Sequence, residues 1–237
     1  MKDLSISSER DRSPNVNPRG ATSAAEPGAA KPGAATPGAA KRRYQLQRRA
    51  ELQAATRARI VAAAVELHTT VGPAATTISA IAKRAGVQRV TVYRHFPTLE
   101  SLFFACTARG AELWPPPDPE AWHQIASPEA RLRRALADVY RYYRLLGHGL
   151  EVILRDAPRV PVVSELLSRR QQKMIDAVAG AWRVRGRRKR LLLAVVGHAL
   201  EFATWQSLTA RGGLSDGEAI ALMAQLILSA AGPDATR

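Results

Sequence analysis

The chain has 237 residues, of which 46% are hydrophobic, and this length suits one or two domains with a sizeable core. The net charge of +15 favours a polyanionic partner, either nucleic acid or an anionic membrane surface, although arginine-rich genome composition is an alternative explanation. The single cysteine, Cys106, excludes an intramolecular disulfide and indicates a reducing compartment. No apolar run reaches the roughly 18–20 residues that span a bilayer, and the N-terminus lacks a signal-peptide pattern. We therefore expect a cytoplasmic protein without a membrane partner.

Residues 1–40 are predicted to be a disordered tail, because they are rich in Pro, Gly and Ala and contain three PGAA units. A basic arm is predicted over residues 41–52, within a stretch, 41–59, that has seven Lys and Arg residues and one acid. Nothing in this stretch breaks a helix, so it either extends the first helix or remains a mobile arm. Beside a DNA-binding module it would add phosphate contacts, and the alternative is a solvated helix end.

Three helices are predicted between residues 57 and 96. In the first helix, apolar residues recur every three or four positions: Ile60, Ala64, Leu67 and Val71. The sequence VGPAATT stops it, and TTISAIAKRAG then predicts a short helix that Thr76 or Thr77 caps and Gly86 ends. A third short helix over residues 88–96 stops before Pro97. Two short helices joined by a glycine turn are the layout of a helix-turn-helix, and we assign this domain to residues 53–113.

The third helix has the pattern of a recognition helix. Val92 and Phe96 lie four residues apart on one face, and they would anchor the helix to the core together with Leu99 and Leu102 farther along the chain. The opposite face would meet base edges in the major groove, and its flanks would meet phosphates.

The predicted DNA-contacting residues follow from that geometry: Thr77, Gln88, Arg89, Val90, Thr91, Tyr93, Arg94 and His95. Arg94 suits a bidentate contact to guanine, Thr91 a base edge and Val90 a thymine methyl group. Tyr93 and His95 suit phosphate oxygens, and the preceding helix would bind a phosphate through its N-terminus at Thr77.

These residues resemble the DNA-binding region of TetR-family (tetracycline-repressor-like) transcriptional regulators. The matching elements are TTISAIAKRAGV, TVYRHF and the following proline and LF pair, and the resemblance covers roughly residues 53–113. Gln88 departs from the usual Ser or Thr, Val90 from a frequent Gly, and Thr98 and Leu99 stand where the family often has a Lys. The resemblance implies a homodimer with a ligand-responsive C-terminal domain, in which the bound ligand releases DNA.

Residues 114–237 are predicted to form a helical effector-binding and dimerisation domain. A helix begins at Ser127 and Pro128, a short one covers 149–156, and a longer one follows from residue 160. The last two helices, over 190–208 and 215–231, are so apolar that their burial requires both a core and a partner surface. This motivates a homodimer in which two helices from each subunit form a four-helix interface.

An effector pocket in such a domain would be mainly apolar with a few polar groups. The candidate ligand-binding residues are Tyr143, Met174, His198, Glu201 and Trp205. No metal site, cofactor or enzymatic motif is expected: the five histidines are scattered, and no phosphate loop, GxSxG or dinucleotide fingerprint is present.

The sequence thus predicts an all-α protein with an N-terminal helix-turn-helix domain and a C-terminal helical domain. The predicted function is a sequence-specific regulator, a repressor that binds a palindromic operator in double-stranded DNA as a homodimer and is released by a small molecule. The alternative is a sequence-independent, nucleoid-type DNA-binding protein, which the high positive charge would also suit.

Overall fold

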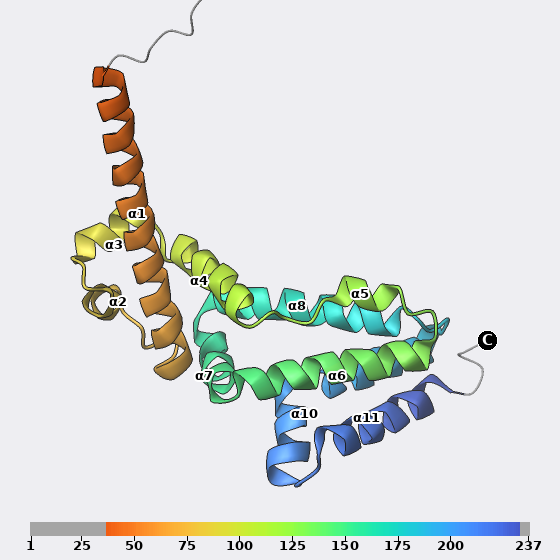
Figure 1. The fold of residues 1–237 in the computed structure, drawn as a ribbon. Helices are drawn as coiled ribbons and strands as arrows, with labels where there is room; N and C mark the ends of the chain where they lie inside the picture. The colour runs from red at the N-terminus through yellow and green to blue at the C-terminus, as the bar shows by residue number, and fades with distance from the viewer. Residues whose placement is uncertain (1–36, 233–237) are drawn as a thin grey trace, which may run out of the picture. The chain divides into compact units, whose positions relative to one another are not determined.

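The structure is a computed structural model that describes residues 37–232, and every regular element in that range is helical (Figure 1). The prediction of an all-α fold is therefore confirmed. The predicted disordered tail falls almost wholly on residues 1–36, which lie outside the described residues.

The described residues contain eleven α-helices and two short helical segments of other types. In chain order they are α1 (Pro37–Thr70), α2 (Ile78–Ala85), α3 (Arg89–His95), α4 (Leu99–Leu113), α5 (Pro119–His123), α6 (Pro128–Leu146), α7 (His148–Asp156), the 3-10 turn η1 (Ala157–Arg159), α8 (Pro161–Ala179), α9 (Gly186–Ala199), α10 (Phe202–Gln206), the π-helical turn η2 (Ser207–Arg211) and α11 (Asp216–Ala231).

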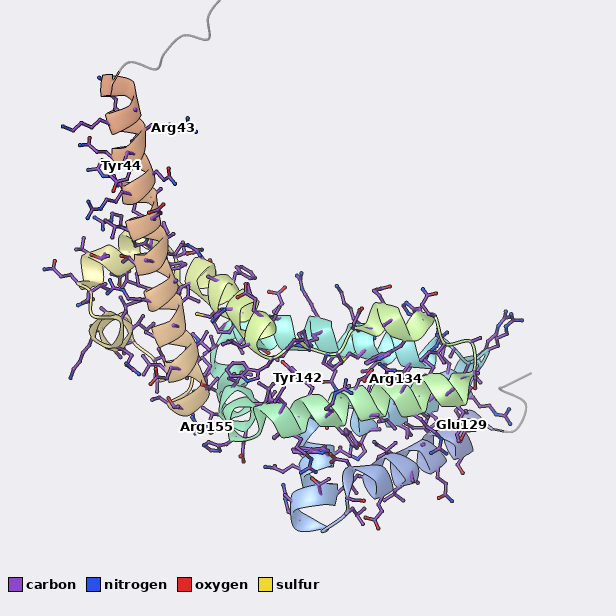
Figure 2. The ribbon with its side chains drawn as sticks, in the orientation of Figure 1. Arg43, Tyr44, Glu129, Arg134, Tyr142 and Arg155 are labelled. Atoms are coloured by element: carbon purple, nitrogen blue, oxygen red, sulfur yellow. The ribbon has the colours of Figure 1, made fainter. Side chains whose placement is uncertain are left out.

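The chain divides into two units, and the boundary falls between Leu46 and Gln47 inside α1. The predicted basic arm, residues 41–52, is helical and exposed. Of the two possibilities, an extension of the first helix or a mobile arm, the structure has the helical extension. Arg43 and Tyr44 project from this part of α1 in Figure 2. Their exposure leaves the side chains free for a polyanionic partner.

Within the second unit, α1 to α4 enclose one small core. Its most buried side chains are Ile60, Ala64, Ile81, Ala82, Val92, Phe96 and Leu102, each at most 3% exposed. The predicted apolar faces of the first three helices are thus confirmed, with two exceptions. Val71 lies just beyond α1 and is exposed, and Leu99 lies in the first turn of α4 with 68% of its surface exposed.

A second, larger core lies between α5, α6, α8, α9, α10 and α11. In Figure 1, α6 lies beside both α8 and α11. The predicted start of α6 is confirmed, because the Ser127 hydroxyl accepts a hydrogen bond from the Ala130 N–H at 3.3 Å and Pro128 occupies the first turn. A capping box at Ser215 and Glu218 likewise starts α11.

The prediction of one continuous helix over 190–208 is wrong. The helix α9 ends at Ala199, the backbone becomes extended at Glu201, and the following segment to Arg211 is turned by 59°. Two tyrosines of α6 explain the break, because Tyr140 and Tyr143 donate their hydroxyl hydrogens to the carbonyls of Ala199 and Leu200 at 3.0 and 2.6 Å. These carbonyls therefore have buried partners outside their own helix.

None of the described helices alone has the length and apolar composition to cross a membrane. The bent pair formed by α9 and the segment Phe202–Arg211 meets both criteria together.

His68 lies where α1 packs on α4, with its ring centroid 5.5 Å from that of Phe103. Desolvation by burial lowers the pKa of His68 from 6.5 to about 4. The neutral ring is therefore favoured by folding, and this contribution is complete above pH 6.5 and is lost as the pH falls toward 4. We expect H68Q to remove on the order of 1–2 kcal/mol of the pH dependence of unfolding between pH 7 and pH 4.

The measurement is urea unfolding at each pH, with H123Q as the control because His123 is exposed on α5. The free energy of unfolding of the H123Q control should depend on pH as that of the wild type does. If the unfolding free energy of H68Q has the same pH dependence as that of the wild type, burial of this ring does not govern its protonation.

Candidate nucleic-acid interface

The turn between α2 and α3 is built from local signals. The Thr77 hydroxyl accepts a hydrogen bond from the Ala80 N–H at 3.1 Å and caps the start of α2. Gly86 ends α2 in the left-handed conformation at φ +65°, which glycine adopts without steric cost. The N–H of Val87 then donates to the Ala82 carbonyl at 2.9 Å. The turn is therefore tight, and α3 follows α2 after three residues.

The core side of α3 is formed by Val92 and Phe96, at 0% and 2% exposure, as predicted. Gln88 stands at the N-cap but makes no side-chain capping hydrogen bond, so its amide is free for another partner. On the outer side, Val90 and Tyr93 are 67% and 46% exposed.

The structure brings the predicted DNA-contacting residues together on α3 and at the start of α2. Six of them are exposed: Thr77, Gln88, Arg89, Val90, Tyr93 and Arg94. Thr91 and His95 are half-buried at the edge of this surface. Among the described residues, Arg89 and Arg94 make no ion pair with a carboxylate, and their guanidinium groups have no competing internal partner.

Two contacts that the sequence did not reveal hold this surface on α1. The guanidinium of Arg57 lies over the Phe96 ring at 4.6 Å from its centroid, at the end of α3. Arg84 of α2 pairs with Glu66 of α1 through two contacts of 3.0 and 2.7 Å. Both pairs orient α2 and α3 relative to the first helix.

A third contact connects the turn after α1 to α7. The Asp156 carboxylate is 3% exposed and accepts a hydrogen bond from the Ala74 N–H at 3.0 Å. Arg155 donates to the other oxygen of Asp156 and to the Val71 carbonyl, at 3.0 and 3.2 Å. The bond from Arg155, followed by that from Ala74, lowers the pKa of Asp156 and keeps it ionised. Figure 2 shows Arg155 beside the C-terminal end of α1.

A cavity of about 300 Å³ lies in the C-terminal helical domain. Three of the predicted ligand-binding residues line it, Tyr143, Met174 and Glu201, with mostly apolar neighbours from α6, α7, α8 and α10. The break between α9 and α10 contributes directly, since Glu201, Phe202 and Ala203 all face the cavity. The size and lining are typical of a small-molecule site.

The other two predicted ligand-binding residues lie elsewhere. His198 lines an open groove between α8 and α9, which shares Glu201 with the cavity. Trp205 is buried and donates its indole N–H to Asp216 at 3.0 Å, so it supports the start of α11 and does not line the cavity. Sequence reasoning missed three polar lining residues, Tyr142, Arg170 and Gln171, and no local pattern distinguishes them from their neighbours.

A second cavity, of about 240 Å³, lies between α1 and α4 on one side and α6, α7 and α8 on the other. Tyr142, Leu150, Leu167 and Arg170 line both cavities. These shared side chains thus separate the 300 Å³ cavity from the part of the second cavity that α1 and α4 line. Within residues 37–232, no group of three or more His, Cys, Asp and Glu side chains is placed to hold a metal ion.

Comparisons with known proteins agree with this geometry. Residues 60–106, which run from α1 into α4, match the family model described as bacterial regulatory proteins, tetR family. None of the curated proteins matches the chain. Among solved structures, the fold is similar to a TetR-like transcriptional regulator from Rhodococcus sp. RHA1, with 23% identity, a TM-score of 0.52, and coverage of 73% of this chain and 93% of that chain.

Two further solved structures are similar at lower TM-scores. One is a putative TetR-family regulator from Mesorhizobium loti MAFF303099, with 17% identity, a TM-score of 0.48, and coverage of 75% of this chain and 96% of that one. The other is the multidrug binding protein EbrR complexed with imidazole, with 22% identity, a TM-score of 0.48, and coverage of 75% and 91%. Residues 60–106 thus match the DNA-binding region of the tetR family, and the fold of the chain is similar to that of a TetR-like transcriptional regulator.

Proposed function

We propose that the protein is a repressor that binds a palindromic operator as a homodimer and leaves it when a small molecule occupies the C-terminal domain. The observation that carries the proposal is the two-sided α3. Its inner side is fully buried at Val92, whereas its outer side holds exposed polar and basic side chains without internal partners. A helix of this kind can dock on its domain and read base edges at the same time.

The proposed contacts follow the exposure of the side chains. Arg94 and Gln88 would read purines in the major groove, and Val90 would meet a thymine methyl group. Tyr93, His95 and Thr77 would contact phosphates on either side. The free side-chain amide of Gln88 supports a base-reading role, because the residue does not cap α3.

The proposed dimer interface is the outer surface of α9 and α11. Three leucines there have much of their surface exposed: Leu191, Leu222 and Leu226, at 46%, 39% and 48%. Neighbouring small residues, Ala194 and Ala221, are also exposed on the same helices. Exposed apolar side chains that gather on two adjacent helices support a subunit interface there, and a two-fold symmetric dimer would match a palindromic operator.

The proposed effector site is the cavity lined by Tyr143, Met174 and Glu201. A route to the DNA-binding helices exists in the contacts of Arg155 and Asp156, which join α7 to the turn between α1 and α2. Leu150 and Leu154 of α7 also line the cavity. A ligand that moves α7 would therefore also move the turn between α1 and α2. We propose that the protein acts in the cytoplasm, where the chromosome lies.

The test is selection of bound sequences from a random duplex library, at two salt concentrations, followed by sequencing. Enrichment of a palindrome, with about 10³-fold or greater preference over random DNA, is the expected result. Binding without enrichment that weakens steeply with salt would instead establish the nonspecific alternative, which the net charge of +15 and the exposed basic residues 41–52 favour.

We expect R94A to lower affinity for the selected operator by about 1–3 kcal/mol, with little change on random DNA, because a lost bidentate contact affects only the sequence that it reads. Fluorescence anisotropy with both DNAs measures the difference. R187A is the matched control, since Arg187 is an exposed arginine of α9 without an assigned DNA role, and its operator affinity should be unchanged. If R94A loses the same amount of affinity for both DNAs, Arg94 contacts a phosphate and does not read a base.

A further inference from the structure

One guanidinium nitrogen in the described part of the C-terminal domain is buried without a hydrogen-bond partner. Arg170, in the middle of α8, has an Nη2 atom that is buried and makes no hydrogen bond within the described part of the chain. Its Nη1 reaches the Tyr142 hydroxyl at 3.4 Å, which is a long hydrogen bond, and its Cζ lies 4.9 Å from the centre of the Tyr142 ring. No carboxylate among residues 37–232 lies within ion-pair distance of it. Burying an unpaired donor of a charged group is costly, so this arrangement requires an explanation.

Several other arginines of this domain have carboxylate partners within the chain. Arg134 and Arg141 both pair with Asp138, and Arg144 forms two hydrogen bonds to Asp216. The adjacent Arg169 is exposed and pairs with Glu165. Thus these arginines pair with a carboxylate of the chain, whereas Arg170, which faces the cavity, does not.

Arg170 lines the 300 Å³ cavity, and most of the other lining groups are apolar. They come from α6, α7, α8 and α10: Val139, Leu150, Leu154, Leu167, Met174 and Phe202. The Tyr143 hydroxyl is already used by the Leu200 carbonyl, so it offers no hydrogen-bond donor to a ligand. The Glu201 carboxylate and the Gln171 amide also line the cavity, and Arg170 is the one cationic side chain among the described residues that line it.

We propose that the effector of this protein is a small amphipathic carboxylate whose carboxyl group binds Arg170 and whose apolar part fills the cavity. The planar guanidinium presents parallel donors that match a carboxylate, and such charge-assisted pairs are stronger than hydrogen bonds between neutral groups. The volume holds on the order of ten non-hydrogen atoms, because one liquid water occupies roughly 30 Å³. A carboxyl group with a chain of about seven carbons fits that limit.

The position of Arg170 also relates the ligand to DNA binding. Arg170 and Tyr142 line both this cavity and the second cavity, which α1 and α4 enclose from the other side. In Figure 2, Tyr142 lies between α6 and α8. A carboxylate that draws the guanidinium away from Tyr142 changes a wall that both cavities share. The inference rests on the proposed ligand-responsive function and names the chemical class of its ligand.

The test measures binding first, without DNA, by isothermal titration of the full chain with sodium octanoate and sodium 4-phenylbutanoate. Matched probes are 1-octanol and octylammonium chloride, which keep the chain length and replace the carboxylate with a neutral or cationic group. We expect at least one carboxylate to bind, with 1-octanol at least tenfold weaker and octylammonium weaker still. Absence of binding by both carboxylates, or equal binding of octanoate and 1-octanol, would overturn the proposal.

Variants then assign the contact. R170Q should weaken carboxylate binding by about 10- to 100-fold and leave 1-octanol binding within about threefold. R170K, which keeps the charge but loses the planar pair of donors, should be intermediate. R169Q is the matched control, because Arg169 is the adjacent exposed arginine, and it should bind like the wild type. If R170Q binds the carboxylates as the wild type does, Arg170 is not the receptor. Circular dichroism and the melting temperature check that each variant is folded.

A second readout separates this proposal from the proposed function. The carboxylate that binds is added to the protein–operator complex, and release is followed by anisotropy. Release that R170Q abolishes supports both proposals. Binding that depends on Arg170 but leaves the operator complex unchanged supports the carboxylate site and contradicts ligand-induced release. If another small molecule releases the operator and neither carboxylate binds, the result supports ligand-induced release and contradicts the carboxylate site.

Discussion

The double variant L222E/L226E is expected to be monomeric and to lose operator binding. Both side chains are on α11 and have 39% and 48% of their surface exposed, and the proposed interface would bury them against a second subunit. A two-fold dimer loses four leucine contacts and gains four charges at once. If each leucine contributes about 1 kcal/mol, the dimer dissociation constant rises by about 10³-fold or more. A monomer reaches only one half-site, so affinity for the palindrome should fall by at least 100-fold.

Analytical ultracentrifugation and operator titration measure the two effects. The control is L113E/L145E, which introduces the same charges at leucines of α4 and α6 that are 44% and 58% exposed and lie outside the proposed interface. This control should remain dimeric and bind the operator normally. A dimeric L222E/L226E variant would show that α11 does not form the subunit interface.

G72A is expected to lower the free energy of unfolding by about 2–5 kcal/mol. Gly72 has φ +105°, a backbone conformation that a residue with a Cβ rarely adopts. An added Cβ would also lie 2.1 Å from Asp156 Oδ2, so the carboxylate that accepts from the Ala74 N–H must move. Thermal or urea unfolding at fixed protein concentration measures the loss, and a reduction in melting temperature of several degrees should accompany it.

G217A is the matched control, because Gly217 lies in the first turn of α11 and a Cβ there meets only Ser215 Oγ at 4.0 Å. It should be neutral or slightly stabilising. A double-mutant cycle with D156A separates the two causes: removing the carboxylate relieves the collision with Asp156 but leaves the backbone strain and the 2.9 Å approach to Arg155 Nη2. If the free energy of unfolding of G72A equals that of the wild type, the contacts between α7 and the α1–α2 turn adjust to the added Cβ without cost.

The helix-turn-helix was predictable because its determinants are local. Thr77 caps α2 within three residues, Gly86 ends it, and the spacing of Val92 and Phe96 assigns the inner side of α3. Each of these effects acts within one or two helical turns. The failures in this region, Val71 and Leu99, lie at or beyond helix ends, where periodicity no longer determines which side is buried.

The C-terminal domain was only partly predictable, since its decisive contacts connect residues far apart in the chain. The sequence by itself determined its helical nature, the caps at Ser127 and Ser215, and the apolar character of the final helices. Only the tertiary structure decided where α9 ends, because the Ala199 and Leu200 carbonyls accept hydrogen bonds from the hydroxyls of Tyr140 and Tyr143, which lie 59 and 57 positions away in the chain. Likewise, Arg169 and Arg170 are indistinguishable as sequence neighbours, and only the packing of α8 against α6 leaves Arg170 facing a cavity without a partner.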